Sequence, residues 1–228
     1  MEEVKALAKQ YNTIPVFYEF SADNQTPLNI YTALSKDSRN SFILESVSNG
    51  VQWDRYSFVG VSPKEEICIT GNTAEIRTGD KIETKEVEQP IAFLKERMAA
   101  YRSPVLEGAP NFTGGLIGYF GYDTVRYMEK KLTHVPEDDI HMPDCHLFLY
   151  EELLAYDHLT SNGIVILNLH TDGDLGAQYA AAQWRAEELA DIVRHYNPQP
   201  QIRQHHGESV VRLSLIHISE PTRQAEIS

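Results

Sequence analysis

The residues best suited to bind a small charged ligand lie in one short stretch of the chain. Leu44-Glu45-Ser46 closes one expected strand and Arg55-Tyr56-Ser57 opens the next, with a turn at Asn49-Gly50 between them. If these strands pair, a carboxylate, hydroxyl groups and a guanidinium converge on one edge. Such a set suits a free amino acid, with Glu45 holding the ammonium group and Arg55 the carboxylate. The same two residues could form a structural cross-strand ion pair instead, and the residues alone favour that interpretation.

The remaining motifs favour structural roles over chemistry. The stretch 114–121 lacks the Lys-Ser/Thr pair of a phosphate loop and the spacing of a dinucleotide fingerprint. It therefore predicts a strand that another element approaches closely. Asp172 and Asp174 are expected to cap the last helix rather than to bind calcium. Three histidines have no metal-type spacing and are expected at the surface: His134, His141 and His146. We therefore assign no catalytic and no metal-binding residue.

Composition narrows the class of protein. The 228 residues carry a formal net charge of -13 and contain no run of Lys or Arg, which argues against a nucleic-acid partner. The two cysteines, Cys68 and Cys145, have no metal or redox spacing, which indicates reduced thiols. The charged start at residues 1–5 does not resemble a signal peptide, and no run reaches the ~18 apolar residues of a membrane span. We expect a cytoplasmic protein without a membrane partner.

Hydrophobic periodicity predicts a mixture of helices and antiparallel strands. Apolar residues at helical spacing predict helices at 2–11, 27–36, 90–101 and 175–196, with a short one ending near 132. Branched and aromatic runs predict strands at 14–20, 42–47, 56–60, 66–70, 73–78, 81–87, 147–156 and 163–169. The strands from residue 41 to 87 are expected to form one antiparallel meander. Because strands and helices do not alternate, the fold class is α+β, an antiparallel sheet domain with packed helices.

The sequence is expected to divide into three segments. Residues 1–197 form the expected domain, and 198–212 read as a linker toward a missing domain because they are rich in Pro and Gln. From Leu213 to Arg223 the sequence resembles the in-frame translation of a transposase-type sequencing adapter, and 224–228 would be index and primer sequence. Residues 213–228 are therefore expected to be a non-native tail that takes no part in the fold.

Several motifs, in the same order along the chain, resemble those of a known family. The stretches 42–47, 53–60 and 112–123 are similar to the chorismate-binding enzymes, most closely to the large subunits of anthranilate synthase. Met142-Pro143-Asp144 and the strand ending in Tyr156-Asp157-His158 match the same family. The resemblance extends from about residue 15 to 196. It implies the N-terminal domain of these enzymes, with the catalytic domain missing from the chain.

The resemblance also implies a function for the whole enzyme. Such enzymes convert chorismate and glutamine-derived ammonia to anthranilate and pyruvate, the first committed step toward tryptophan. Mg²⁺ holds the substrate in the C-terminal half, and a glutamine amidotransferase subunit supplies the ammonia. The fragment alone is expected to be inactive. What carries over is the feedback site for tryptophan, which corresponds here to Leu44, Glu45, Ser46 and Arg55, with Tyr56 and Ser57 as less certain members.

Two alternatives remain open. The same domain occurs in aminodeoxychorismate synthase, on the path to folate, although the Leu-Glu-Ser and Trp-Asp-Arg-Tyr-Ser motifs favour the tryptophan branch. A stand-alone amino-acid-binding module without catalysis would require the chain to end near Arg212. Because part of the family's tryptophan pocket comes from the missing half, the fragment is expected to bind tryptophan weakly or not at all.

Overall fold

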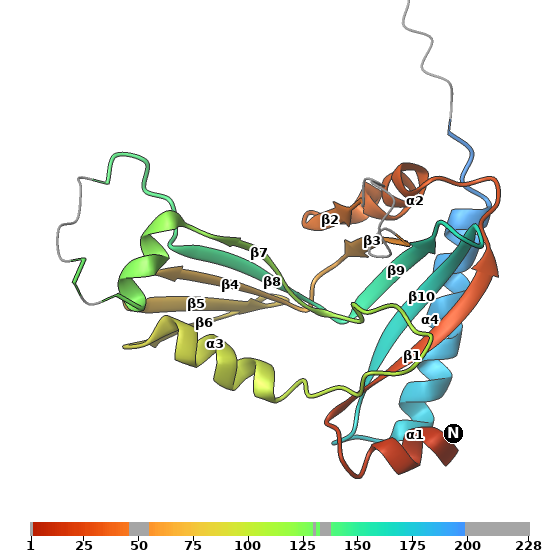
Figure 1. Ribbon diagram of the computed structural model, residues 1–228, viewed down its shortest axis with the longest axis horizontal. Helices are drawn as coiled ribbons and strands as arrows, with labels where there is room; N and C mark the ends of the chain where they lie inside the picture. The colour runs from red at the N-terminus through yellow and green to blue at the C-terminus, as the bar shows by residue number, and fades with distance from the viewer. Residues whose placement is uncertain (1, 46–54, 130, 133–137, 199–228) are drawn as a thin grey trace, which may run out of the picture. The chain divides into compact units, whose positions relative to one another are not determined.

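The computed structural model describes residues 2–45, 55–129, 131–132 and 138–198 (Figure 1). The chain divides into two units, Met1–Tyr196 and Asn197–Ser228. Every described helix and strand belongs to the first unit. The expected linker and the expected non-native tail lie outside the described residues, apart from Pro198.

The first sheet contains five antiparallel strands in the order β1-β10-β9-β3-β2. Their bounds are β1 (Thr13–Ser21), β10 (Asn162–His170), β9 (Glu152–Asp157), β3 (Tyr56–Val61) and β2 (Ser41–Leu44). Nine consecutive residue pairs join β1 to β10, which makes this the longest ladder of the sheet. Strands from both ends of the described chain therefore lie side by side at one edge of this sheet, as Figure 1 shows.

The second sheet also contains five antiparallel strands, in the order β6-β5-β4-β8-β7. Their bounds are β6 (Lys81–Glu86), β5 (Thr73–Thr78), β4 (Glu65–Thr70), β8 (Cys145–Tyr150) and β7 (Gly115–Phe120). Gly71 and Gly79 close the two hairpins with φ of 57° and 58°, a left-handed conformation that glycine adopts without a Cβ penalty. Both turns were predicted from the sequence.

Two sequence predictions about the strands are wrong. Residues 41–87 do not form one meander, because β2 and β3 belong to the first sheet and β4, β5 and β6 to the second. Residues 147–156 do not form one strand, because the chain breaks at Glu151 between β8 and β9. The chain thus crosses from one sheet to the other twice. Ser62, with φ of 51°, bends the first crossing, and Lys64 Nζ lies 2.7 Å from Glu151 Oε1 and so joins the two crossings.

The helices cover one face of the first sheet and one of the second. Their bounds are α1 (Glu2–Leu7), α2 (Pro27–Leu34), α3 (Pro90–Ala99) and α4 (Leu175–Arg194), with 3-10 turns η1 (Ser35–Asp37) and η3 (Tyr122–Tyr127). The first helix is shorter than the predicted 2–11. Leu94 of α3 packs against Ile67 and Ile76 of the second sheet. The face of α4 that holds Ala186, Leu189 and Val193 packs on the first sheet, as its periodicity predicts.

Capping residues define where the main helices begin. The Thr26 hydroxyl accepts a hydrogen bond from the Asn29 N–H, and Pro27 takes the first helical position of α2. The Asp174 carboxylate accepts from the N–H groups of Gly176 and Ala177 at the start of α4. The prediction that Asp174 is a cap is confirmed.

The glycine-rich strand β7 allows the close approach that the sequence predicts. A Cβ built on Gly118 would lie 2.0 Å from the His146 carbonyl oxygen of β8, and one on Gly114 would lie 2.9 Å from the Tyr150 carbonyl oxygen. Both contacts are to backbone atoms, which cannot move aside as a flexible side chain could. Gly118 and Gly114 are therefore required by the packing of β7 on β8, and this stretch has a structural role.

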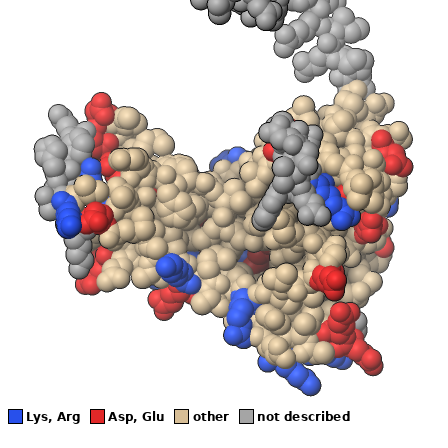
Figure 2. Space-filling view, viewed as in Figure 1, with Lys and Arg blue, Asp and Glu red and all other residues tan. Residues whose placement is uncertain are grey.

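The structure confirms the α+β class and the antiparallel sheets. Cys68 and Cys145 are free thiols. On the face shown in Figure 2, Lys and Arg are separated by neutral surface and by Asp and Glu, and no basic patch forms there. None of the helices in the described part of the chain combines the length and apolarity that a membrane span requires.

Candidate functional site

The end of the first sheet, where β2, β3 and β9 meet, holds the described residues of the candidate site. Strands β2 and β3 pair antiparallel as predicted, with Leu44 opposite Phe58. The same register, extended by one residue, sets Glu45 opposite Ser57. Leu44 and Glu45 are both exposed at the edge of the sheet. Ser46 and the Asn49-Gly50 turn lie outside the described residues.

Arg55 lies just before β3, and its guanidinium binds the buried carboxylate of Asp157, a residue that the sequence matched to the family but did not assign to the site. Arg55 Nη2 lies 2.6 Å from Asp157 Oδ2, and Arg55 Nε lies 3.0 Å from Asp157 Oδ1. Asp157, the last residue of β9, is 2% exposed, whereas the Arg55 side chain is 43% exposed. Among the described residues no ion pair joins Arg55 to Glu45. The alternative of a Glu45–Arg55 ion pair is therefore replaced by an Arg55–Asp157 pair.

The pKa of the Asp157 carboxyl reflects opposing influences. Burial alone raises it, but the hydrogen bonds from Arg55, the Leu159 N–H and the Thr160 hydroxyl outweigh burial and lower it below the ordinary value. The Leu159 N–H donates to Asp157 Oδ1 at 2.9 Å. Asp157 is thus an ionised carboxylate that fixes Arg55 at the end of the sheet.

Tyr56 and Ser57 have different environments. The Tyr56 ring is half-buried, its centroid lies 5.0 Å from the Arg55 guanidinium carbon, and burial raises the pKa of its hydroxyl. Ser57 is 1% exposed, and its hydroxyl lies 2.8 Å from His158 Nε2. His158 is exposed and its backbone N–H donates to the Arg55 carbonyl at 2.9 Å. Asp157 and His158 therefore belong to the site, although sequence reasoning missed them.

This arrangement is suited to binding rather than to covalent chemistry. A nucleophilic serine needs a base beside it and an open path to the reacting atom. Ser57 has His158 beside it but is buried, so its hydroxyl cannot reach a substrate. In the residues that the structure describes, no group of three or more His, Cys, Asp or Glu side chains could hold a metal ion. What the site offers is an exposed carboxylate at Glu45 and a fixed cation at Arg55.

The comparison with known families decides where the chain belongs. The sequence model of the family described as chorismate binding enzyme matches residues 52–217, which is well over half of the chain. The chain belongs to the chorismate-binding enzyme family. The match includes Arg55, Tyr56, Ser57, Asp157 and His158. It also extends through the expected linker and over the first five residues of the expected tail.

Two similar proteins bear the name anthranilate synthase component 1. The chain is 38% identical over 182 residues to anthranilate synthase component 1 of Acetivibrio thermocellus, covering 80% of the chain and 36% of that protein. It is 37% identical over 196 residues to anthranilate synthase component 1 of Pseudomonas aeruginosa, covering 85% of the chain and 39% of that protein. The crystal structure of anthranilate synthase component I from Streptococcus pneumoniae TIGR4 is 26% identical, with a TM-score of 0.46, and covers 77% of the chain and 36% of that structure. The chain thus spans little more than a third of the length of these relatives.

The other residues that the sequence singled out and the structure describes lie away from the candidate site. His146 of β8 is half-buried, and its Nε2 lies 2.7 Å from Glu66 Oε1 of β4. His141 is exposed, as predicted, and His134 lies outside the described residues. Asp172 borders an open cavity beside Lys64 and does not cap α4. Of the described residues among them, none joins the residues at the end of the first sheet.

Proposed function

We propose that this chain is the N-terminal part of an anthranilate synthase component I and that it carries the tryptophan feedback site of that enzyme. The observation that supports the proposal is the similarity to component 1 proteins at 37–38% identity over at least four fifths of the chain. The names of these relatives favour the tryptophan branch over the folate branch. The fold, with an open polar edge beside a buried apolar core, suits a binding domain.

In the proposed whole enzyme, chorismate and glutamine-derived ammonia give anthranilate and pyruvate, and the reaction takes place in the cytoplasm. The part of the enzyme that would hold Mg²⁺ and chorismate corresponds to the remaining two thirds of the relatives' length. The glutamine amidotransferase subunit would supply ammonia to that part. The residues of this chain would act in regulation and not in the chemical step.

Tryptophan is proposed to bind where β2 and β3 end. Its ammonium group would be held by Glu45, whose exposed carboxylate has no ion-pair partner among the described residues. Its carboxylate would be attracted by Arg55, which Asp157 fixes in position. Leu44, Ser46 and Tyr56 complete the proposed site, with Leu44 and Tyr56 offering apolar contact. The buried Ser57 would contribute indirectly, by holding His158 beside the site.

The sharpest test separates a ligand role from a structural role. Arg55 is a poor position for it, because its removal leaves Asp157 buried without its cation. Glu45 is the better position, since its substitution by glutamine changes one exposed charge and leaves the fold intact. Glu187→Gln, an exposed carboxylate on α4, is the matched control.

The assay uses a chimera that joins residues 1–197 to the remainder of the Acetivibrio thermocellus relative. Anthranilate fluorescence reports activity, and its decline with added tryptophan reports the feedback site. Glu45→Gln should raise the half-inhibitory tryptophan concentration at least about tenfold, because about 1.4 kcal/mol of lost charge-assisted hydrogen bonding corresponds to a factor of ten. KM for chorismate and Tm should not change. Equal inhibition of Glu45→Gln, Glu187→Gln and the parent chimera would refute the proposed site.

A further inference from the structure

Strand β1 forms an open edge of the first sheet. It pairs with β10 on one side and is the last strand of its sheet on the other. The candidate tryptophan site lies at the opposite edge, where β2 ends the sheet. An unpaired edge offers a row of backbone donors and acceptors to which another extended chain can add. The direction of these groups follows from the pairing of β1 with β10.

The hydrogen bonds at the two ends of the ladder show which residues of β1 face outward. The Thr171 N–H donates to the Asn12 carbonyl, and the Ala22 N–H donates to the Ser161 carbonyl. Hydrogen-bonded pairs recur at every second residue of an antiparallel ladder, so the even-numbered residues of β1 bond to β10. The odd-numbered residues therefore direct their N–H and C=O groups away from the sheet. The Thr13 N–H confirms this, since it donates outward to the Arg102 carbonyl.

The outward groups remain available beyond Thr13. The segment that contains Arg102 meets the edge at Asn12 and Thr13 and then leaves it. Pro15 has no N–H and stands at an outward position, where a strand tolerates proline. Phe17 and Glu19 follow, and among the described residues their backbone groups have no partner on this side. Two donors and two acceptors are thus free in the middle of the edge.

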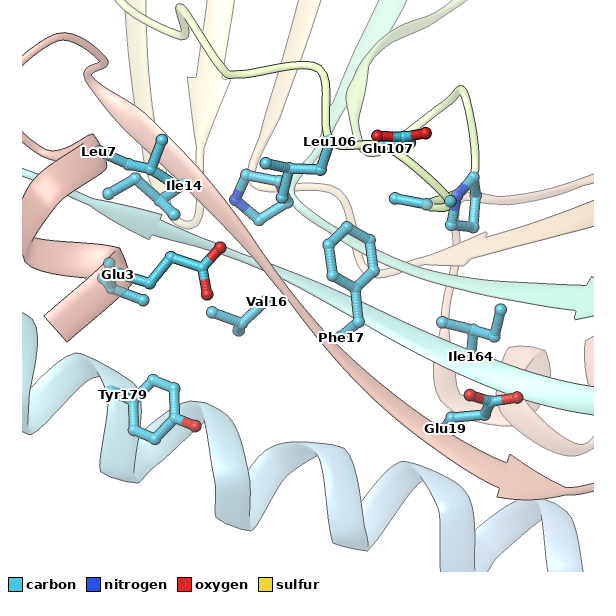
Figure 3. Close-up of a pocket in the computed structure, with 15 residues that line it drawn as sticks. Glu3, Leu7, Ile14, Val16, Phe17, Glu19, Leu106, Glu107, Ile164 and Tyr179 are labelled. Atoms are coloured by element: carbon cyan, nitrogen blue, oxygen red, sulfur yellow. The ribbon is translucent and has the colours of Figure 1, made fainter. Parts of the chain in front are cut away.

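A groove of about 690 Å³ runs along this edge. Figure 3 shows the Phe17 ring directed toward the loop that carries Leu106 and Glu107, with Tyr179 of α4 on the other side of β1. Val4 and Leu7 of α1 line the same groove. The Phe17 side chain is 37% exposed, unusual for a phenylalanine beside a core. The groove therefore offers apolar contacts on both faces of any strand that is added to β1.

The charges of the groove indicate its occupant. Glu3, Glu19 and Glu107 line it, and none of its other lining residues in the described part of the chain is Lys, Arg or His. Glu19 Oε1 accepts a hydrogen bond from the Asn162 side chain at 2.6 Å, and among the described residues none of the three carboxylates forms an ion pair. A second copy of the chain would bring the same carboxylates together, which is unfavourable. A segment with basic side chains would neutralise them.

We propose that the free edge of β1 binds an extended segment of another polypeptide, in which apolar residues are flanked by lysine or arginine. The segment adds a sixth strand to the first sheet through the outward groups of Phe17 and Glu19. Its apolar side chains contact Phe17 and Leu106 on one face and Tyr179 on the other. Its basic side chains pair with the carboxylates of Glu3, Glu19 and Glu107. This site lies at the edge of the sheet opposite to the proposed tryptophan site.

The test uses the full chain and a labelled, acetylated peptide of sequence Lys-Val-Ile-Lys-Val-Ile-Lys, with binding measured by fluorescence anisotropy. Two variants separate the backbone from the side chain. Glu19→Ala removes the carboxylate, whereas Glu19→Pro removes the carboxylate and the outward N–H. Because that N–H does not bond to β10, Glu19→Pro should keep the Tm of Glu19→Ala within a few degrees. Tyr18→Pro removes an N–H that bonds to β10 and should lower Tm strongly.

The expected result is that Glu19→Pro binds the peptide at least tenfold more weakly than Glu19→Ala. The same peptide with every second amide methylated, or with Glu in place of Lys, should bind at least tenfold more weakly to the parent chain. Equal affinity of the two Glu19 variants, equal affinity of the methylated peptide, or no binding of the parent peptide would overturn the proposal. A dimer of the parent chain that Glu19→Pro converts to a monomer would also overturn it, since the edge would then bind a second copy.

Discussion

The pair formed by Arg55 and Asp157 predicts how the end of the first sheet responds to substitution and to pH. Asp157→Asn keeps the shape of the side chain and an acceptor for the Leu159 N–H but removes the charge that holds Arg55. Hydrogen bonds to charged groups contribute about 1.5–3 kcal/mol in general. Since the Arg55 side chain is 43% exposed, solvent weakens the attraction and the lower end of that range applies. For a folded unit of this size the loss corresponds to a fall in Tm of about 3–6 °C at pH 7.

The pH dependence has a defined sign. The folded-state pKa of Asp157 is lowered, so its contribution is present above the unfolded pKa, about 3.9, and is lost as the pH falls through the folded value. The difference in Tm between the parent chain and Asp157→Asn should therefore be constant from pH 7 to about 5 and should shrink below about 4. Circular dichroism melts at a series of pH values measure this difference.

The matched control is Asp191→Asn. Asp191 pairs with Arg194 on the surface of α4 with an Oδ1–Nη1 distance of 3.0 Å, and its side chain is 60% exposed. Surface pairs of this kind contribute about 0–1 kcal/mol, so the control should melt close to the parent chain. If Asp157→Asn also melted like the parent chain at pH 7, or if its deficit persisted unchanged at pH 3, Arg55 would not be fixed by Asp157 and the description of the site would be wrong.

Two further outcomes follow from packing. Gly118→Ala places a Cβ against the His146 carbonyl of β8 and should lower the free energy of unfolding in urea by about 1–3 kcal/mol. An unchanged urea midpoint would show that β7 can move away from β8. Burial raises the pKa of the Cys145 thiol to about 11 and leaves that residue 1% exposed, whereas Cys68 is half-buried. A disulfide reagent at pH 8 should modify Cys68 at least about tenfold faster, and Cys145 should react readily only after unfolding; equal rates would contradict this burial.

The sequence predicted local structure more closely than it predicted how strands are grouped. Turn residues and alternation located the hairpins at Gly71 and Gly79, and Thr26 and Asp174 marked the starts of two helices. These features depend on neighbouring residues. Sheet membership depends on contacts between residues far apart in the chain, so the alternating pattern through 41–87 could not show that β3 and β4 belong to different sheets. The break at Glu151 was missed because apolar, strand-forming runs stand on both sides of Glu151-Glu152.

In the candidate site, too, local features were predictable from the sequence and long-range contacts were not. The pairing of β2 with β3 was predictable, because the two runs are close in sequence and end at facing positions. The partner of Arg55 was not, because Asp157 lies 102 residues away and meets Arg55 only through the pairing of β3 with β9. The polar pair Asp157-His158 at the end of an apolar strand was the one indication in the sequence. Only the strand register, in which Tyr56 faces Asp157, shows that Asp157 lies beside Arg55.

The Arg55–Asp157 pair also changes how the two interpretations of the site should be weighed. From the sequence, a ligand-binding role for Arg55 and an ion pair between Arg55 and Glu45 were treated as mutually exclusive alternatives. In the structure a different carboxylate fixes the guanidinium, and Glu45 is left exposed without an ion-pair partner among the described residues. A fixed cation loses less side-chain entropy when an anion binds than a mobile one does. The buried Asp157 is therefore compatible with both interpretations: it stabilises the end of the sheet, and in the proposed site it would hold Arg55 in place for a carboxylate.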